Sequence, residues 1–146
     1  MFKNILIPTD GSELSQRAVR IAMDLAKLHQ ARITGIHVIP DYHLLIAYEG
    51  AFDPVTEERI EEEAKTRAES YLGFVRKAAS DAGVPCDTVC ETSDHPYDAI
   101  LKTAEAKHCD LIVMTSHGRK GLAAVLLGSE TRKVLTHASI PVLIVR

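Results

Sequence analysis

The sequence has little net charge and no long apolar run. Lysine and arginine number 17 against 20 aspartates and glutamates, a formal net charge of -3. Such a balance gives no overall field that would attract nucleic acid or an anionic membrane. No segment approaches the roughly 20 apolar residues of a membrane span, and Pro8 and Asp10 break the opening apolar run before it reaches the length of a secretory signal. We therefore expect neither a nucleic-acid partner nor a membrane partner, and any anion site must be a local pocket.

Cysteine is also scarce. The chain has three, Cys86, Cys90 and Cys109, an odd number that argues against a disulfide framework, and we expect a reducing, cytoplasmic compartment. Cys86 and Cys90 form no CxxC motif, so we expect small buried side chains rather than metal ligands. A metal-binding motif such as HExxH is missing as well. No structural metal is therefore predicted from the remaining histidines, which include His29, His43, His95, His108 and His137.

What is present fits one folded α/β domain over residues 1–146. Apolar residues make up 46% of the chain and charged residues 25%, and a chain of this length buries about 68–70% of its unfolded surface. Apolar spacing alternates between the strand and helix types, which predicts βαβ units and a parallel sheet. The stretch 40–54 has no assignment. The expected strands are 2–7, 33–39, 84–92, 110–114 and 140–145, and the expected helices are 12–28, 56–82, 96–108 and 129–137.

Local signals mark helix ends and buried faces. Ser12 is a candidate N-cap of the first helix, and Gly83 is a candidate stop of the second. The first helix is expected to bury an apolar face that includes Leu28. Strands 110–114 and 140–145 contain almost no polar residue, so we expect helices to cover both of their faces and both strands to anchor the core.

Two loops follow strands and carry residues suited to a ligand. In open α/β sheets, ligands bind beyond the carboxyl ends of the strands, where the strand order reverses. The loop 8–12 follows the first strand, and the loop 115–118 follows the fourth. If these strands are neighbours, both loops line one crevice.

The segment from Gly118 to Ser129 is suited to binding phosphate. Glycines let backbone amides approach a ligand, and the N-terminus of a helix offers donors and a favourable dipole. Gly118 opens a Gly-Arg-Lys-Gly run, and Gly128 and Ser129 begin the last helix. The alternative is that Gly128 and Ser129 are only a helix cap and Gly118 only a turn. Spacing alone does not separate the two interpretations.

Several motifs together resemble the universal stress protein family over essentially the whole chain. They are residues 5–12, His37-Val38, 116–118, 127–129 and 141–145. The nucleotide-binding branch of that family carries a G-x2-G-x9-G-[ST] pattern, and nine residues separate Gly118 from Gly128 here. The resemblance implies a doubly wound, Rossmann-like fold of the adenine nucleotide alpha hydrolase type. Its five-stranded parallel sheet would have the order 3-2-1-4-5, with helices on both faces.

The resemblance also implies a site for ATP with Mg²⁺, or for ADP, AMP or cyclic AMP. Asp10 would contact the ribose or, indirectly, the nucleotide-bound Mg²⁺, and the backbone of Val38 would pair with adenine. Phosphates would lie on Gly118, Gly128 and Ser129 and on the amide of Glu130. The other residues expected around the nucleotide are Pro8, Thr9, Thr115, Ser116, His117, Arg119 and Gly121.

Three positions bear on how well that site would work. Thr115 stands where the pattern has its first glycine, which would weaken binding unless its hydroxyl donates to the ligand. The carboxylate of Glu130 either faces the phosphates and repels them or points to solvent. His117 has no oriented partner in the sequence, so we expect it to stabilise its loop by hydrogen bonding rather than to act as a catalytic acid or base.

The function implied by the resemblance is a stress-response regulatory module with, at most, slow ATP hydrolysis. One rival is a nucleotide-free dimer that binds an unknown protein partner. Another is a nucleotide-utilising enzyme, but the SGGxDS and HxGH motifs of related classes are missing from both loops. The fifth strand would leave an apolar sheet edge exposed, so we expect a homodimer through residues 141–145.

Overall fold

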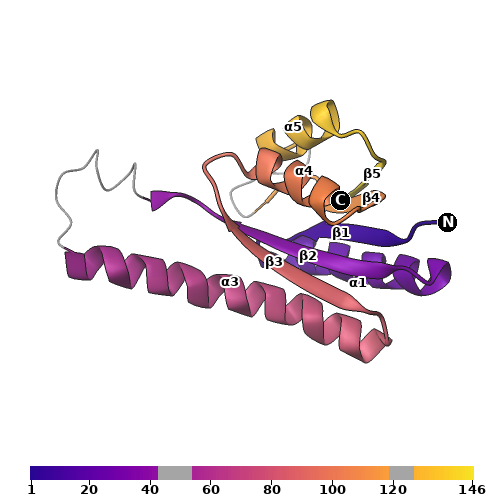
Figure 1. The fold of residues 1–146 in the computed structure, drawn as a ribbon, viewed down its shortest axis with the longest axis horizontal. Helices are drawn as coiled ribbons and strands as arrows, with labels where there is room; N and C mark the ends of the chain where they lie inside the picture. Colours follow the sequence, from indigo (N-terminus) through magenta and orange to yellow (C-terminus); the bar gives the residue numbers. More distant parts are fainter. Residues whose placement is uncertain (43–53, 119–126) are drawn as a thin grey trace.

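Five parallel strands form one sheet in the order β3-β2-β1-β4-β5 (Figure 1). The computed structural model describes residues 1–42, 54–118 and 127–146. The predicted order 3-2-1-4-5 is confirmed. The strands are β1 (Asn4–Pro8), β2 (Arg32–Ile39), β3 (Cys86–Thr92), β4 (Leu111–Thr115) and β5 (Val142–Val145).

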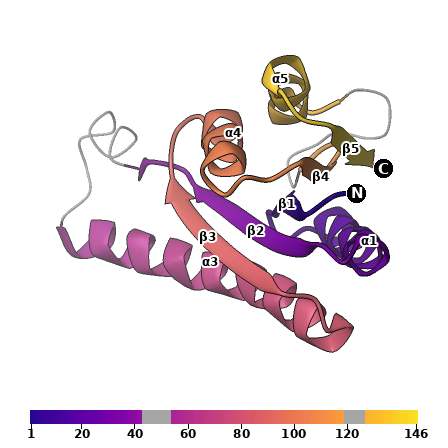
Figure 2. The same ribbon diagram turned by 45° about the vertical axis from the view of Figure 1, so that its right-hand side comes forward.

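Helices cover both faces of the sheet, as expected. Helices α1 and α3 lie on one face and α4 and α5 on the other (Figure 2). In the described ranges, no helix is both long and apolar enough to cross a membrane. The helices are α1 (Glu13–His29), α3 (Pro54–Ala82), α4 (Pro96–Ala106) and α5 (Ser129–His137).

Side chains of β1 point alternately to the two faces of the sheet, and each face has its own core cluster. Ile5 and Ile7 are fully buried in the cluster that includes Val75 of α3, and Leu6 is fully buried in the opposite cluster with Val134 of α5. Successive side chains of a strand point to opposite faces, so a central strand covered on both faces is apolar throughout. Each buried aliphatic side chain stabilises the fold by about 1.5–3 kcal/mol.

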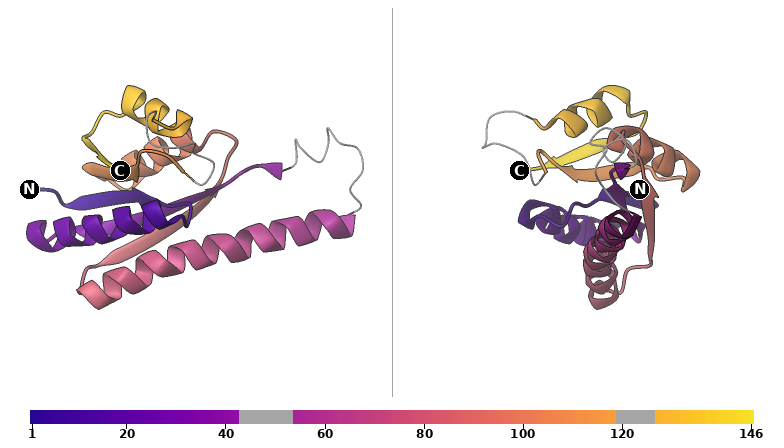
Figure 3. Two further views of the ribbon diagram at one scale, coloured as in Figure 1. Left: turned by 180° about the vertical axis from the view of Figure 1, so that it is seen from behind. Right: turned by 90° about the vertical axis from the view of Figure 1, so that its left-hand side faces the viewer.

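The predicted helix signals are confirmed. The side chain of Ser12 accepts a hydrogen bond from the amide of Ser15 at 3.2 Å, and Gly83 ends α3 with a φ of +67°. Pro96 occupies the first turn of α4. Helix α3 is 29 residues long and runs well past the end of the strands it covers (Figure 3).

Three expectations about burial are wrong. Strand β5 lies at the sheet edge as predicted, but helices do not fully cover both of its faces, and Leu143 is 39% exposed. Leu28 is 77% exposed, because it lies on the opposite side of α1 from the buried Ala22 and Ala26. Cys90 is exposed on β3, the other edge strand, and Cys86 is only half-buried.

Candidate functional site

The loops after β1 and β4 meet. Strands β1 and β4 pair through Ile5 with Leu111 and Leu6 with Ile112, so their carboxyl ends lie at one end of the sheet. A β-carbon built on Gly118 would lie 2.7 Å from Oδ2 of Asp10. The carboxylate of one loop therefore lies directly against the backbone of the other.

Local hydrogen bonds shape the loop after β1. The amide of Ser12 donates to Oδ1 of Asp10 at 3.0 Å, and the amide of Gly11 donates to Oγ1 of Thr9 at 3.2 Å. The hydroxyl of Thr9 also lies 3.1 Å from that of Ser15 in α1. Asp10 is half-buried, and these bonds hold its carboxylate beside the start of α1.

His37 and Tyr71 support this loop, and sequence reasoning gave neither of them that role. Nδ1 of His37 donates to the carbonyl of Thr9 at 2.8 Å, and its ring makes an edge-on contact with Tyr71 at 5.1 Å between centroids. Gly11 has a φ of +76°, and a β-carbon there would lie 2.2 Å from the Tyr71 ring. Tyr71 falls on the apolar stripe of α3, whose spacing indicates a core residue. Nothing in that spacing predicts that its ring supports the loop after β1.

The first turn of α5 is anchored to the end of β4. The amide of Gly128 donates to the carbonyl of Ser116 at 2.7 Å, and Oγ1 of Thr131 donates to the carbonyl of Thr115 at 2.9 Å. A β-carbon on Gly128 would lie 3.3 Å from Cα of His117. A larger residue at position 128 would therefore press on the backbone of His117 by a few tenths of an ångström.

The N-terminus of α5 presents backbone amides of the kind that suit an anion. The first intrahelical bond runs from the amide of Arg132 to the carbonyl of Gly128 at 3.0 Å. The preceding amides belong to the N-terminal set that has no intrahelical acceptor, and they lie at the positive end of the helix dipole. Ser129 and Gly118 are exposed, so donors and open backbone are accessible next to Asp10.

The carboxylate of Glu130, whose side chain is 34% exposed, has two hydrogen-bond partners. Its Oε2 accepts the amide of Tyr97 in α4 at 2.9 Å, and its Oε1 accepts Nζ of Lys133 at 2.9 Å. The sequence predicted neither of these two partners of the carboxylate. The sequence gave no sign of the contact with Tyr97, because the two residues belong to different helices.

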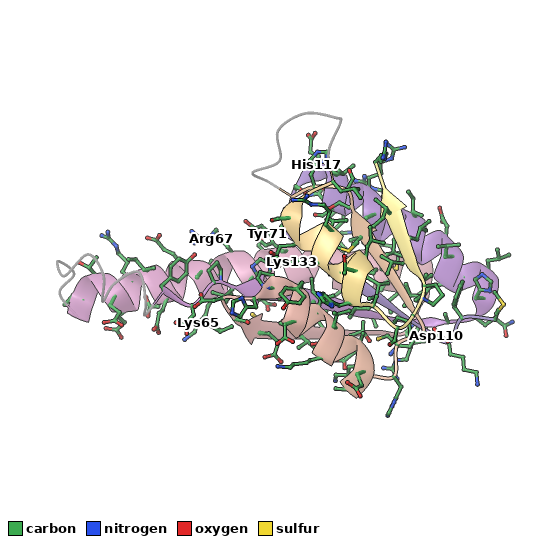
Figure 4. All side chains as sticks on the ribbon, turned by 90° about the horizontal axis from the view of Figure 1, so that it is seen from above. Lys65, Arg67, Tyr71, Asp110, His117 and Lys133 are labelled. Carbon is green, nitrogen blue, oxygen red and sulfur yellow. The ribbon has the colours of Figure 1, made fainter. Side chains whose placement is uncertain are left out.

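The remaining expected residues lie around the same end of the sheet. Thr115 and Ser116 are buried, and Oγ of Ser116 lies 3.0 Å from Nδ1 of His117, a contact within the loop (His117 is labelled in Figure 4). Pro8 ends β1, and Val38 is half-buried near the end of β2. Arg119 and Gly121 lie outside the described residues. In the described part of the chain, no group of three or more His, Cys, Asp or Glu side chains is placed to hold a metal ion.

Comparison with known proteins gives matches over the full length. The model of the universal stress protein family matches residues 1–146. A universal stress protein of Thermus aquaticus is 36% identical over 149 residues, with 100% of both chains covered. The solved structure of MJ0577, a universal stress protein of Methanocaldococcus jannaschii, has a TM-score of 0.79 at 32% identity and covers 99% of this chain and 96% of that one.

Two further solved structures share the fold and hold a nucleotide. The universal stress protein from Archaeoglobus fulgidus in complex with dAMP has a TM-score of 0.72 at 20% identity, with 99% of this chain and 98% of that one covered. A universal stress protein in complex with cAMP has a TM-score of 0.67 at 24% identity, with 99% and 97% covered. At these identities the likeness shows the fold alone.

Proposed function

The chain belongs to the universal stress protein family, and from that premise we propose that it binds an adenine nucleotide between the loops after β1 and β4. ATP with Mg²⁺ is the form we propose first, and AMP, ADP and cyclic AMP are the alternatives. Family members in complex with dAMP and cAMP support the ligand class. The observation that carries the proposal is the contact of Asp10 with Gly118 beside the N-terminus of α5.

The chemistry of each group in the site suits one part of the nucleotide. Backbone amides at the start of α5, with the hydroxyl of Ser129 and the open backbone of Gly118, would hold the phosphates. Asp10 carries the carboxylate that would contact the ribose or, indirectly, Mg²⁺, since carboxylate oxygens suit that ion. The backbone of Val38 would pair with the adenine edge. The other residues proposed around the nucleotide are Pro8, Thr9, Thr115, Ser116, His117, Arg119 and Gly121.

The proposed role is regulatory, in a stress response, with at most slow ATP hydrolysis. His117 is the histidine next to Gly118 in the loop after β4, and its Nδ1 lies within hydrogen-bonding distance of Ser116, which supports a role in the loop. We further propose that the protein acts in the cytoplasm and forms a homodimer through β5. Leu143 of β5 and Leu135 of α5, each 39% exposed, support that interface.

Titration calorimetry with ATP and Mg²⁺ tests the proposal. Ser129→Ala should weaken binding about threefold to tenfold, because a neutral hydrogen bond contributes roughly 0.5–1.5 kcal/mol. Ser139→Ala is the matched control, since that serine is exposed just beyond α5 and should leave affinity unchanged. Equal affinity of the Ser129 variant and the wild type would show that the phosphate site is elsewhere.

A nucleotide-free dimer is the second candidate, and Thr115 favours it. Threonine stands where the nucleotide-binding pattern has glycine, and its carbonyl already accepts the hydroxyl of Thr131. Mass spectrometry of the freshly purified, denatured protein would detect a retained adenine nucleotide. Absence of binding at millimolar ATP, with a dimer in solution, would establish this second function instead.

A further inference from the structure

Helix α4 takes its N-terminal cap from α5. Its own N-cap residue, His95, makes no side-chain capping bond to any residue that the structure describes. A helix start leaves backbone amides that need an acceptor. The amide of Tyr97, in the first turn of α4, donates to Oε2 of Glu130 at 2.9 Å. The missing cap is therefore supplied by a residue in the first turn of another helix.

Lys133 holds the same carboxylate from the other side. Its Nζ donates to Oε1 of Glu130 at 2.9 Å and lies 5.3 Å from the centre of the Tyr97 ring. Lys133 extends from α5 next to α4 (Figure 4). The Tyr97 ring also contacts the ring of His137, at 5.7 Å between centroids. Glu130, Lys133 and Tyr97 thus form a closed set of contacts that joins α4 to α5.

These contacts fix the position of the Glu130 carboxylate and its negative charge. A carboxylate in the first turn of α5 has two positive helix ends nearby, its own and that of α4. Hydrogen bonds to Glu130 come from α4 and from Lys133, and they offset part of its charge, since the Glu130 and Lys133 side chains are 34% and 47% exposed. An anion at the start of α5 then meets less repulsion than the sequence alone suggests.

Hydrogen bonds to β4 and to α4 together hold the first turn of α5. Gly128 and Thr131 bond to the end of β4, and Glu130 lies between them in the sequence and bonds to α4. Donors fixed before the ligand arrives bind it with less loss of entropy than donors that must be ordered. The turn that would contact the phosphates is therefore held in place by β4 and α4 together.

We propose that Glu130 is a positioning residue for the nucleotide site: its carboxylate caps α4, and this contact orients the first turn of α5 and keeps the charge away from the phosphates. The inference rests on the proposed function. It assigns the side chain of Glu130 a favourable effect on affinity, although an acidic residue beside a phosphate site is ordinarily unfavourable.

The sign of the effect on affinity tests this proposal. Titration calorimetry with ATP and Mg²⁺ should show that Glu130→Ala binds about threefold to tenfold more weakly than the wild type. Glu130→Gln should recover part of that loss, because its amide oxygen still accepts the Tyr97 amide. Glu105→Ala, which removes one exposed carboxylate near the other end of α4, controls for the change in net charge and should bind as the wild type does.

Hydrogen exchange at the Tyr97 amide gives a readout that does not involve the nucleotide. Exchange should be faster in Glu130→Ala than in the wild type or Glu105→Ala, with circular dichroism to confirm folding. If Glu130→Ala and Glu130→Gln bind ATP as tightly as the wild type or more tightly, the positioning role is overturned while nucleotide binding stands. If the wild type itself binds no nucleotide, the proposed function and this inference both fail.

Discussion

Oδ2 of Asp10 lies 2.7 Å from the position that a β-carbon on Gly118 would occupy. The first residue follows β1 and the second follows β4, which are paired strands. An exposed glycine therefore leaves room for a carboxylate from the neighbouring loop. The contact makes the two loops one site, and a single methyl group is enough to test it.

Gly118→Ala should weaken nucleotide binding at a modest cost in stability. The added methyl group displaces the Asp10 carboxylate, which also accepts the Ser12 amide at 3.0 Å. Loss of that hydrogen bond costs about 0.5–1.5 kcal/mol of unfolding free energy, while affinity for ATP with Mg²⁺ falls. Calorimetric titration and urea denaturation measure the two quantities.

Gly73→Ala is the matched control for that variant. Gly73 lies inside α3, where an added β-carbon would meet, among the described residues beyond the helix's own backbone, an Arg76 nitrogen at 3.7 Å. Alanine there should stabilise the fold by about 0.5–1 kcal/mol and leave affinity alone. If Gly118→Ala binds as the wild type does, Asp10 does not contact the nucleotide.

Gly11→Ala should destabilise the fold. Its φ of +76° is unfavourable for alanine, and the β-carbon would lie 2.2 Å from the Tyr71 ring. Backbone strain of this kind costs about 1–3 kcal/mol, and displacement of the Tyr71 ring adds to it. Urea denaturation should show the loss as a lower midpoint. An unchanged midpoint would mean that Tyr71 does not pack against this loop in solution.

The ion pair between Asp87 and Lys107 should make a small, pH-dependent contribution to stability. The hydrogen bond from Lys107, at 2.8 Å, lowers the pKa of the Asp87 carboxyl. Since the folded state favours the charged carboxylate, the stabilisation is complete above the unfolded pKa of about 3.9 and is lost as the pH falls through the lowered folded value. Both side chains are over 40% exposed, so the pair contributes less than about 1 kcal/mol.

Asp87→Asn measures that contribution. At pH 7 the variant should lose under about 1 kcal/mol of unfolding free energy in urea, and added salt should reduce the difference. As the pH falls through the lowered folded pKa of Asp87, the variant and the wild type should converge in stability, because the carboxyl becomes protonated in both states. A difference that persists at low pH would show that hydrogen bonding or packing, rather than charge, separates the two proteins.

The sequence predicted those features that depend on neighbouring residues or on periodicity. The cap at Ser12, the stop at Gly83 and the strand order are of this kind, the last with help from the family resemblance. The contact between Glu130 and Tyr97 could not be predicted, because it depends on how two helices pack. Exposure of Cys90 and Leu143 was missed for a related reason: the predicted order places β3 and β5 at the edges, but it does not show how far helices cover the faces of an edge strand.

Leu143→Lys should convert the proposed dimer into a monomer. Strand β5 ends the sheet, so the backbone groups along its outer side have no strand partner among the described residues. Pairing two copies of β5 would satisfy those groups and cover Leu143, which is 39% exposed. A lysine at that position on each copy would place two charges in the interface, and charges at an edge strand oppose pairing.

Sedimentation velocity at micromolar concentration measures the assembly, and Leu28→Lys is the control. Leu28 is 77% exposed on α1, so the same substitution there adds the same charge outside β5 and should leave the dimer intact. Dissociation of both variants would indicate that net charge, not the β5 edge, governs association. A wild type that sediments as a monomer would contradict the interface outright, because Leu143 would then be exposed in solution without a partner. Dissociation of Leu143→Lys alone would locate the contact at β5, since the two variants differ only in where the lysine stands.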